Sequence, residues 1–186
     1  MEIVLASASP RRQELLKNAG IPFSVRPANL KEIRRPNEDP MAFAERMARE
    51  KAHAVHESIP NGCILAADTV VVLDDQVFGK PNSAADAARM LRRLAGRRHN
   101  VITGVCLLGT GFEDVRSETT TVQFNQLTDD EIQHYISTGE PMDKAGAYGI
   151  QGLASRWISR IEGDYFNVVG LPVALVWGML HEHGLL

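Results

Sequence analysis

The sequence predicts an α/β fold, in which helices flank a mixed sheet. Apolar runs of strand length alternate with amphipathic helical segments along the chain. The runs 99–108 and 115–124 are joined by a short segment containing two glycines, which is typical of a hairpin. A chain of 186 residues suits one domain or two small lobes and is long enough to bury a sizeable core.

The composition excludes some classes of protein. A formal net charge of -3 argues against a general nucleic-acid binder, which is normally basic. The longest apolar stretch, near the C-terminus, is too short to cross a bilayer, and no charged and apolar signal precedes the first strand. Both cysteines, Cys63 and Cys106, lie in apolar runs, which favours buried free thiols over a disulfide. We therefore expect a cytoplasmic protein that binds neither nucleic acid nor membrane.

The first dozen residues predict a strand, a tight turn and the start of a helix. Residues 3–6 are apolar, Ser9 is a good N-cap, and Pro10 fits the first helical position. Arg11 and Arg12 then fall in the first helical turn, where cations oppose the partial positive charge of the helix end. Backbone N–H groups, a hydroxyl and two guanidinium groups would make a phosphate site. A surface helix with two early arginines explains this stretch equally well.

A long helix is expected from Met41 to about Ser58, with Asp39 and Pro40 at its start. Its apolar row includes Lys51, a cation that either extends to solvent or points into a ligand cleft. The segment 27–36 before it is charged, carries Glu32, and is interpreted as a solvated loop.

The run 63–73 is almost continuously apolar and predicts a central strand, interrupted once by Asp68 and Thr69. An isolated carboxylate there would cost several kcal/mol of desolvation, so Asp68 must be paired, bound to a metal, or placed at a strand break. Beyond the turn at 74–76 lies Lys80, which taken alone is best interpreted as a loop lysine.

The rest of the chain supplies further helices, strands and one glycine-rich loop. Trp157 and Trp177 are expected in the core. The expected elements are an amphipathic helix over 84–95 with outward arginines, the hairpin strands, a helix opened by a capping box at 128–131, a glycine-rich loop at 141–152, a strand at 156–161 and a core helix at 171–180.

The cations and acids in unusual settings favour phosphate chemistry. Four cations, Arg11, Arg12, Lys51 and Lys80, and two acids, Glu32 and Asp68, suit a polyphosphate ester, a divalent cation held by carboxylate oxygens, and an activated water. Asp68 would either deprotonate that water or orient one acidified by the metal. The sequence contains no GxxxxGK[ST] phosphate loop and no HExxH metal motif.

The sequences of these motifs resemble those of the Maf family of nucleoside triphosphate pyrophosphatases, once described as septum formation proteins. The matching segments follow the family's order and cover nearly the whole chain. They are LASASPRRQELL (5–16), AREKA (48–52), AADTVV (66–71), GKP (79–81), GRRHNVITGV (96–105), GEPMDKAGAYGIQG (139–152) and GDYFNVVGLP (163–172).

The resemblance implies one Maf-like domain over 1–186, with two lobes around a central cleft as in ITPase-like folds. It implies hydrolysis between the α and β phosphates, with Mg or Mn as cofactor. Asp68 matches the proton acceptor, with Asp68 and Glu32 as the candidate metal ligands. The substrate-binding positions matched are Ser7, Arg11, Arg12, Glu32, Lys51 and Lys80, and those linked to base choice are Arg12, Thr69 and Gln151.

The loop sequence DKAGAYGIQG resembles that of the branch that prefers dTTP and UTP. A glutamine amide can pair with the O4 and N3–H edge of thymine or uracil, which agrees with this resemblance. Modified pyrimidine nucleotides, a 7-methyl-GTP-type substrate, and a nucleotide-binding regulator of septation with incidental hydrolysis stay open as alternatives, as does a homodimer. Asp164 and Trp157 depart from the family's commonest residues, serine and phenylalanine, which bears on fine specificity.

Overall fold

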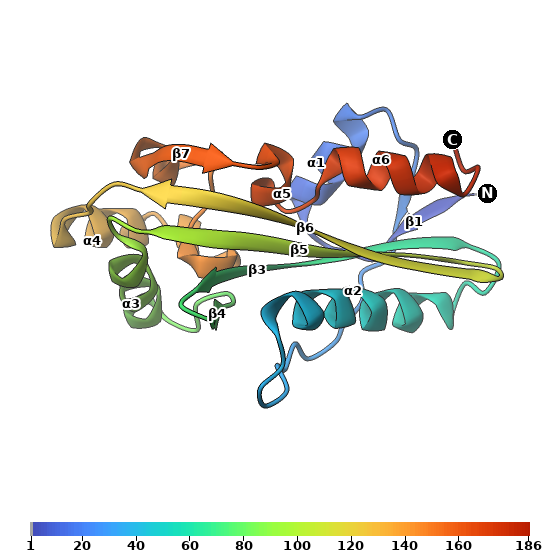
Figure 1. Ribbon diagram of the computed structural model, residues 1–186, viewed down its shortest axis with the longest axis horizontal. Coiled ribbons are helices and arrows are strands. Elements are labelled where there is room, and N and C mark those ends of the chain that lie inside the picture. The colour runs from blue at the N-terminus through green and yellow to red at the C-terminus, as the bar shows by residue number, and fades with distance from the viewer. Residues whose placement is uncertain (1) are drawn as a thin grey trace. The chain divides into compact units, whose positions relative to one another are not determined.

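The computed structural model describes residues 2–186 and has a seven-stranded mixed sheet with helices on its faces, which confirms the predicted α/β class (Figure 1). The strand order is β2-β1-β3-β5-β6-β7, with β4 paired to β3. The strands are β1 (Ile3–Leu5), β2 (Ser24–Val25), β3 (Cys63–Leu73), β4 (Gln76–Phe78), β5 (Arg98–Gly109), β6 (Phe112–Phe124) and β7 (Ile158–Glu162). The helices are α1 (Pro10–Asn18), α2 (Pro40–His56), α3 (Ala84–Leu94), α4 (Asp129–Ser137), α5 (Tyr165–Val169) and α6 (Val173–Glu182), and three short 3-10 turns lie at Glu140–Asp143, Ala145–Ala147 and Leu153–Trp157.

The chain forms two compact units. The first unit comprises the chain up to Thr69, residues 103–118, and the chain from Gly170 onward, whereas the second comprises residues 70–102 and 119–169. Strands β3, β5 and β6 each contribute residues to both units. The single domain and the central cleft expected from the sequence stay predictions.

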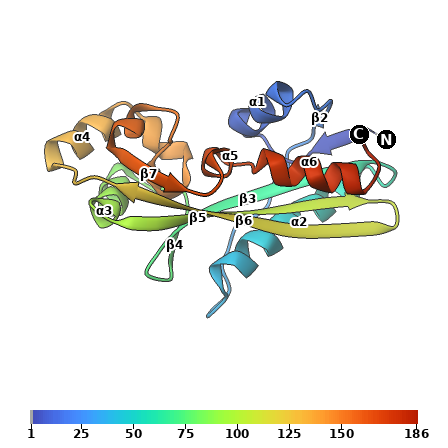
Figure 2. The same cartoon turned by 45° about the horizontal axis from the view of Figure 1, so that its top comes forward.

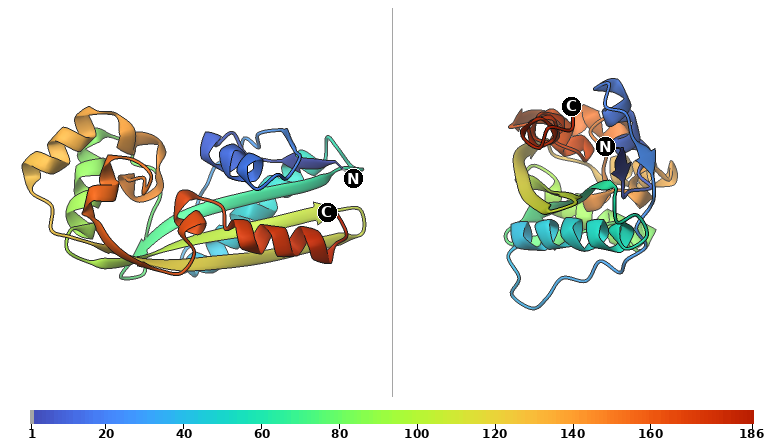
Figure 3. Two further views of the ribbon diagram at one scale, coloured as in Figure 1. Left: turned by 90° about the horizontal axis from the view of Figure 1, so that it is seen from above. Right: turned by 90° about the vertical axis from the view of Figure 1, so that its right-hand side faces the viewer.

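In the first unit, α2 covers one face of the strands and α1 and α6 cover the other (Figure 3). The α2 face is closed by small and branched side chains. They are Val4, Ala6, Ala48, Ala52, Val55, Ile64, Ala66, Cys106 and Leu108. Because the residues of β3 in this cluster are even-numbered, even positions of β3 point toward α2 and odd positions point away from it.

Strand β1 lies between two parallel partners and ends at the turn into α1. It pairs with β2 through Leu5 and Val25, and with β3 through Leu5 and Leu65. The backbone N–H of Ala6 extends the second pairing to the carbonyl of Leu65 at 2.8 Å. The carboxyl ends of parallel strands, at a point where the chain departs to both sides, are where open α/β sheets bind ligands. The turn after β1 therefore lies beside residues 66–69 at a favourable place for a site.

The second unit has its own core, formed by α3, α4, the 3-10 turns and the strand segments beneath them (Figure 2). Helix α3 buries Ala87, Leu91 and Leu94 and exposes its arginines, as its periodicity predicts. Helix α4 begins with the predicted capping box, in which Thr128 accepts from the N–H of Glu131 and the Glu131 carboxylate accepts from the N–H of Thr128.

Several expectations are confirmed, whereas the burial of Trp177 and the core helix at 171–180 are wrong. Cys63 and Cys106 are buried free thiols, and Trp157 is buried, as expected. Trp177 is 47% exposed, because α6 covers the strands with one side only and is not surrounded as a core helix would be. Asp68 does not interrupt its strand, since β3 continues from Cys63 to Leu73. No helix within residues 2–186 combines the length and apolarity needed to span a membrane.

The closest approach of α2 to the sheet depends on Gly104 of β5. A Cβ built there would lie 2.4 Å from the backbone carbon and oxygen of Ala44, and helix backbone cannot yield as a flexible side chain can. We expect Gly104→Ala to destabilise the protein by about 1–3 kcal/mol through overpacking, measured by urea denaturation. Gly178→Ala in α6 is the matched control, because its Cβ would meet nothing within 4 Å. It should be neutral or stabilising by about 0.5–1 kcal/mol. Equal stability of the two variants would contradict this account of the packing.

Candidate functional site

Two groups of polar side chains meet at the end of β1, and all of them belong to the first unit. Successive side chains of β3 point to opposite faces of the sheet, so the two groups lie on opposite sides of this strand. Asp68 continues the even positions that face α2, whereas Thr69 faces the side of α1 and α6. Of these two neighbouring residues of one buried strand, each therefore belongs to one of the two groups.

The first group is built around the Arg12 guanidinium. Ser9 caps α1 and Pro10 occupies its first position, which places Arg12 in the first turn, as the sequence predicts. Arg12 Nε donates to the carbonyl of Gly170 at 2.8 Å, Nη1 to Ser7 Oγ at 3.2 Å, and Nη2 to Thr69 Oγ1 at 3.0 Å. A planar guanidinium held through three nitrogens is fixed in orientation, although its charge would oppose the helix dipole.

The second group is built around the Lys51 ammonium of α2. Lys51 Nζ donates to Asp68 Oδ1 and to Glu32 Oε1, each at 2.6 Å. Lys51 is 8% exposed and Asp68 is 4% exposed, whereas Glu32 lies on an irregular segment and is exposed. The choice left open by the sequence is thus decided: Lys51 does not extend to solvent but is buried against two carboxylates. Asp68 is paired, as an acid in such an apolar run must be.

Burial dominates the electrostatics of both groups. Desolvation raises the pKa of Asp68 above its ordinary value of 3.8, and this is opposed by the nearby charge of Lys51. Glu32 raises the pKa of Asp68 further, while Arg12 lowers it. Desolvation likewise lowers the pKa of Arg12, which the charges of Asp68 and Glu32 counter. The two groups therefore interact electrostatically although they face opposite sides of β3.

The structure gathers most of the predicted site residues. Ser7, Arg12, Glu32, Lys51, Asp68 and Thr69 are joined within the first unit, and Arg11 is half-buried next to Arg12 in the first turn of α1. Two members of the cluster were missed. They are the carbonyl of Gly170 and the hydroxyl of Thr103, which lies 2.9 Å from Thr69 Oγ1. Thr103 is fully buried. It could have been identified from the sequence as a polar residue in an otherwise apolar strand segment.

Lys80 and Gln151 belong to the second unit, and both are exposed. Their places beside a substrate stay predictions. Within the second unit, the loop that carries Gln151 is well fixed. The N–H of Leu153 donates to Glu140 Oε1 at 3.1 Å, and the N–H of Gly149 donates to Tyr135 Oη at 3.3 Å.

Asp164 and Trp157, the two residues that depart from the commonest pattern of the family, both make contacts within the second unit. The Asp164 carboxylate accepts from the N–H of Phe166 at 2.7 Å, at the start of α5, and its carbonyl accepts from Thr120 Oγ1. Trp157 packs edge-on against Tyr135 and donates its indole N–H to Glu131 at 3.2 Å. Each residue therefore has a local structural role.

Glu32 and Asp68 have the chemistry to hold a divalent cation. Both carboxylates already face one cationic group, the Lys51 ammonium, and they supply the hard oxygen donors that Mg²⁺ and Mn²⁺ prefer. Among residues 2–186, no group of three or more His, Cys, Asp or Glu side chains is placed to hold a metal. Mg²⁺ is commonly held by one or two carboxylates together with substrate phosphates and water.

Residues 2–183 match the family described as "Maf-like protein". A protein named dTTP/UTP pyrophosphatase from Koribacter versatilis (strain Ellin345) is 55% identical over 186 residues, which cover 100% of this chain and 96% of that protein. Proteins of the same name from Syntrophomonas wolfei and Thermococcus gammatolerans are 54% and 49% identical, covering 97% and 94% of this chain and 96% and 93% of those proteins. The solved structure of the Staphylococcus aureus Ham1 protein covers 67% of this chain and 72% of its own, at 15% identity and a TM-score of 0.48, and a likeness this distant supports no inference.

Removing the Lys51 charge should destabilise the protein in a pH-dependent way. In Lys51→Met the carboxylate of Asp68 stays buried without its main counter-charge, which costs about 3–5 kcal/mol at pH 7. A raised folded pKa means that the folded state keeps a proton which the unfolded state loses near pH 3.8, so stability falls as pH rises from there to the folded pKa. The loss measured by urea denaturation should therefore be smaller at pH 4 than at pH 7.

Lys17→Met removes the same charge from the exposed end of α1 and should cost less than about 1 kcal/mol at both pH values. The double variant Lys51→Met, Asp68→Asn should recover part of the loss, because the buried charge is gone. A loss from Lys51→Met that is the same at both pH values would argue against an ionised Asp68.

Proposed function

The chain belongs to the Maf family, and on this premise we propose that it is a nucleoside triphosphate pyrophosphatase that hydrolyses dTTP and UTP to the monophosphate and pyrophosphate. The main support is the buried Asp68–Lys51 pair beside the fixed guanidinium of Arg12. The names of the relatives support the substrates, and the two buried thiols suit a reducing cytoplasm.

We assign phosphate binding to the turn between β1 and α1. The start of α1 presents the positive end of the helix dipole, and Arg11 and Arg12 add two guanidinium groups there. Three of the five N–H donors of Arg12 hold the side chain in place, so its remaining donors are presented in a fixed direction. A phosphate bound here relieves the repulsion between the arginines and the helix end.

Asp68 accepts the proton of the attacking water. In this step the water oxygen bonds to phosphorus at the α–β phosphoanhydride, the bond from that phosphorus to the bridging oxygen breaks, and pyrophosphate leaves. The carboxylate must be ionised to act as a base, and its raised pKa makes it a stronger base than an exposed aspartate. The charge of Lys51 counters the rise in the pKa of Asp68 and so favours the ionised form, and its hydrogen bond holds the orientation of the carboxylate.

Glu32 and Asp68 would hold a divalent cation, Mg²⁺ or Mn²⁺, which when bound neutralises phosphate charge. The protein's own cations share this task, because in-line displacement at phosphorus needs positioning and charge neutralisation more than covalent catalysis. Lys80 is proposed as a further phosphate contact on the strength of the GKP segment.

Base choice is assigned to Gln151, Thr69 and Arg12. A glutamine amide both donates and accepts, so it can pair with the O4 and N3–H edge that thymine and uracil share. Cytosine presents an amino group and an unprotonated N3 on that edge, which reverses the pattern. Pyrimidine nucleotides with an altered 5-position keep the same edge and are included in the proposed substrate range.

Replacement of Asp68 tests its role as proton acceptor. Asp68→Asn should lower kcat by about 10²–10⁴-fold, measured as pyrophosphate release from dTTP with Mg²⁺. The acid limb of the parent's pH profile for kcat/KM should lie above pH 3.8, since activity is lost as pH falls through the raised pKa. Asp130→Asn, on the exposed start of α4, should retain full activity. Full turnover by Asp68→Asn would remove Asp68 from the mechanism.

Base preference tests the assignment of Gln151. Gln151→Ala should reduce the preference for dTTP over dCTP, as a ratio of kcat/KM values, by about tenfold, the size expected from one lost hydrogen-bonded pairing. Gln133→Ala removes an exposed glutamine from α4 and should leave the ratio unchanged. The same panel should include 7-methyl-GTP. A Gln151→Ala ratio equal to that of the parent, or faster turnover of 7-methyl-GTP than of dTTP by the parent, would refute the assignment.

A further inference from the structure

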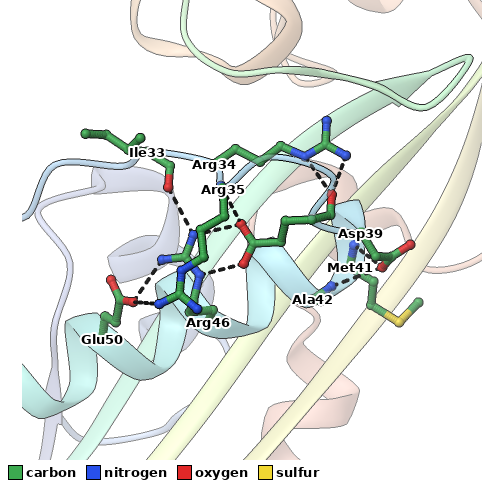
Figure 4. Close-up of polar contacts among 9 residues, drawn as sticks. Ile33, Arg34, Arg35, Asp39, Met41, Ala42, Arg46 and Glu50 are labelled. Carbon is green, nitrogen blue, oxygen red and sulfur yellow. Dashed lines mark hydrogen bonds and ion pairs between the residues drawn. The ribbon is translucent and has the colours of Figure 1, made fainter.

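Side-chain hydrogen bonds hold the segment between β2 and α2, although its many charged residues are typical of a solvated loop. Residues 26–39 form neither helix nor strand, and they carry Glu32. The sequence predicts a solvated loop over 27–36 of this segment. In the structure, the backbone carbonyl of Ile33 and the carboxylate of Glu38 both accept hydrogen bonds from Arg46 of α2 (Figure 4).

Arg46 makes four hydrogen bonds through its guanidinium. Nε donates to Glu38 Oε1 at 2.6 Å and Nη2 to Glu38 Oε2 at 2.8 Å, which is the forked arrangement that makes arginine–carboxylate pairs strong. Nη1 donates to Glu50 Oε1 at 2.8 Å, and Nη2 also donates to the carbonyl of Ile33 at 3.0 Å. The side chains of Arg46 and Glu38 are 14% and 11% exposed, so their pairing is screened less than a surface pair.

Glu38 extends this network to the backbone of the loop. Its second carboxylate oxygen accepts from the N–H of Arg35 at 2.9 Å, and its carbonyl accepts from Arg34 Nε at 2.9 Å (Figure 4). The hydrogen bonds from Arg46 lower the pKa of Glu38 to about 2, so Glu38 stays ionised throughout the neutral range. The loop is thus held at Ile33, at Arg35 and at Glu38.

The contact with Ile33 connects this network to the site. Ile33 directly follows Glu32, and the Glu32 carboxylate meets Lys51 at 2.6 Å. Arg46 and Lys51 both belong to α2, so one rigid helix holds the loop at the backbone of Ile33 and at the neighbouring side chain. Without the first contact, an exposed glutamate on an irregular segment would lose entropy when it orders against Lys51.

We propose that Arg46 is a positioning residue: anchored by Glu38 and Glu50, it fixes the backbone at Ile33 and thereby holds the Glu32 carboxylate against Lys51. Its catalytic consequence rests on the proposed function, in which Glu32 acts at the triphosphate. Arg46 itself touches neither Lys51 nor Asp68 through any of the four hydrogen bonds described here.

Hydrogen exchange of the free protein tests the anchoring without reference to activity. Arg46→Met should speed exchange of the amide of Arg35 and its neighbours by at least about tenfold, because the carboxylate that accepts from that amide loses its anchor. Arg49→Met removes the same charge from the same helix, but Arg49 pairs with Glu113, outside the loop. It should leave exchange in the loop unchanged. Glu38→Gln breaks the fork from the other side and should act like Arg46→Met, should the latter fold poorly.

A double-mutant cycle tests the connection to Glu32. With dTTP, Arg46→Met should lower kcat/KM by about ten- to a hundredfold in the parent, the cost of a misplaced group at a phosphate site, but by less than about twofold in Glu32→Gln. Arg46→Lys keeps the charge but cannot reproduce the fork, so it should restore only part of the loss. Melting temperatures above the assay temperature for every variant exclude simple unfolding.

The outcomes separate the two hypotheses. Equal losses from Arg46→Met in both backgrounds, or loop exchange unchanged by Arg46→Met and Glu38→Gln, would overturn the positioning role. Faster exchange in Arg46→Met combined with full activity of Glu32→Gln supports the anchoring by Arg46 and instead overturns the role of Glu32 in the proposed function.

Discussion

The candidate site depends on one buried ion pair, that between Asp68 and Lys51. A carboxylate in the middle of an apolar strand is tolerated only with a partner at hydrogen-bond distance, and Lys51 provides it at 2.6 Å. Such a pair is a poor way to stabilise a fold, because two well-packed apolar residues of similar volume would serve as well or better. The proposed function explains the pair better, because the charge of Lys51 favours the ionised form of a carboxylate with a raised pKa, next to the turn that is proposed to bind phosphate.

The rest of the first unit can be understood from where β3 places its side chains. Asp68 and Thr69 are adjacent, so they point to opposite faces, toward α2 and toward α1 respectively. Because α1 and α2 cover opposite faces of the strands, one short stretch of β3 receives Lys51 from one side and Arg12 from the other (Figure 3). Gly104 contributes in a different way, by allowing α2 to approach the sheet closely enough for Lys51 to be buried.

The site also combines rigid and irregular backbone. Arg12, Lys51, Asp68 and Thr69 stand on helices or strands, which hold catalytic geometry well. Ser7 and Gly170 stand in short connections between such elements, whereas Glu32 stands on a longer segment, residues 26–39, that forms neither helix nor strand. The charged network around Arg46 compensates for this by attaching that segment to the helix that carries Lys51.

Features that depend on near neighbours in the chain could be predicted from the sequence. The α/β class, the capping box at Thr128, the apolar stripe of α3, and the position of Arg12 in the first turn of a capped helix all follow from local patterns. Asp68 could also be identified as an anomaly, since a charge in an apolar strand requires a partner wherever the strand lies.

The partners of these residues could not be predicted from local patterns, because they lie on distant segments of the chain. Periodicity left Lys51 between solvent and a cleft, gave no connection between Thr69 and Arg12, and indicated a buried Trp177 that is in fact exposed. The loop at 27–36 was predicted to be solvated because Arg46, which holds the backbone of Ile33, lies on the following helix, and that contact depends on packing. Local patterns specify which residues have unusual properties, whereas contacts between distant segments depend on how the whole chain folds.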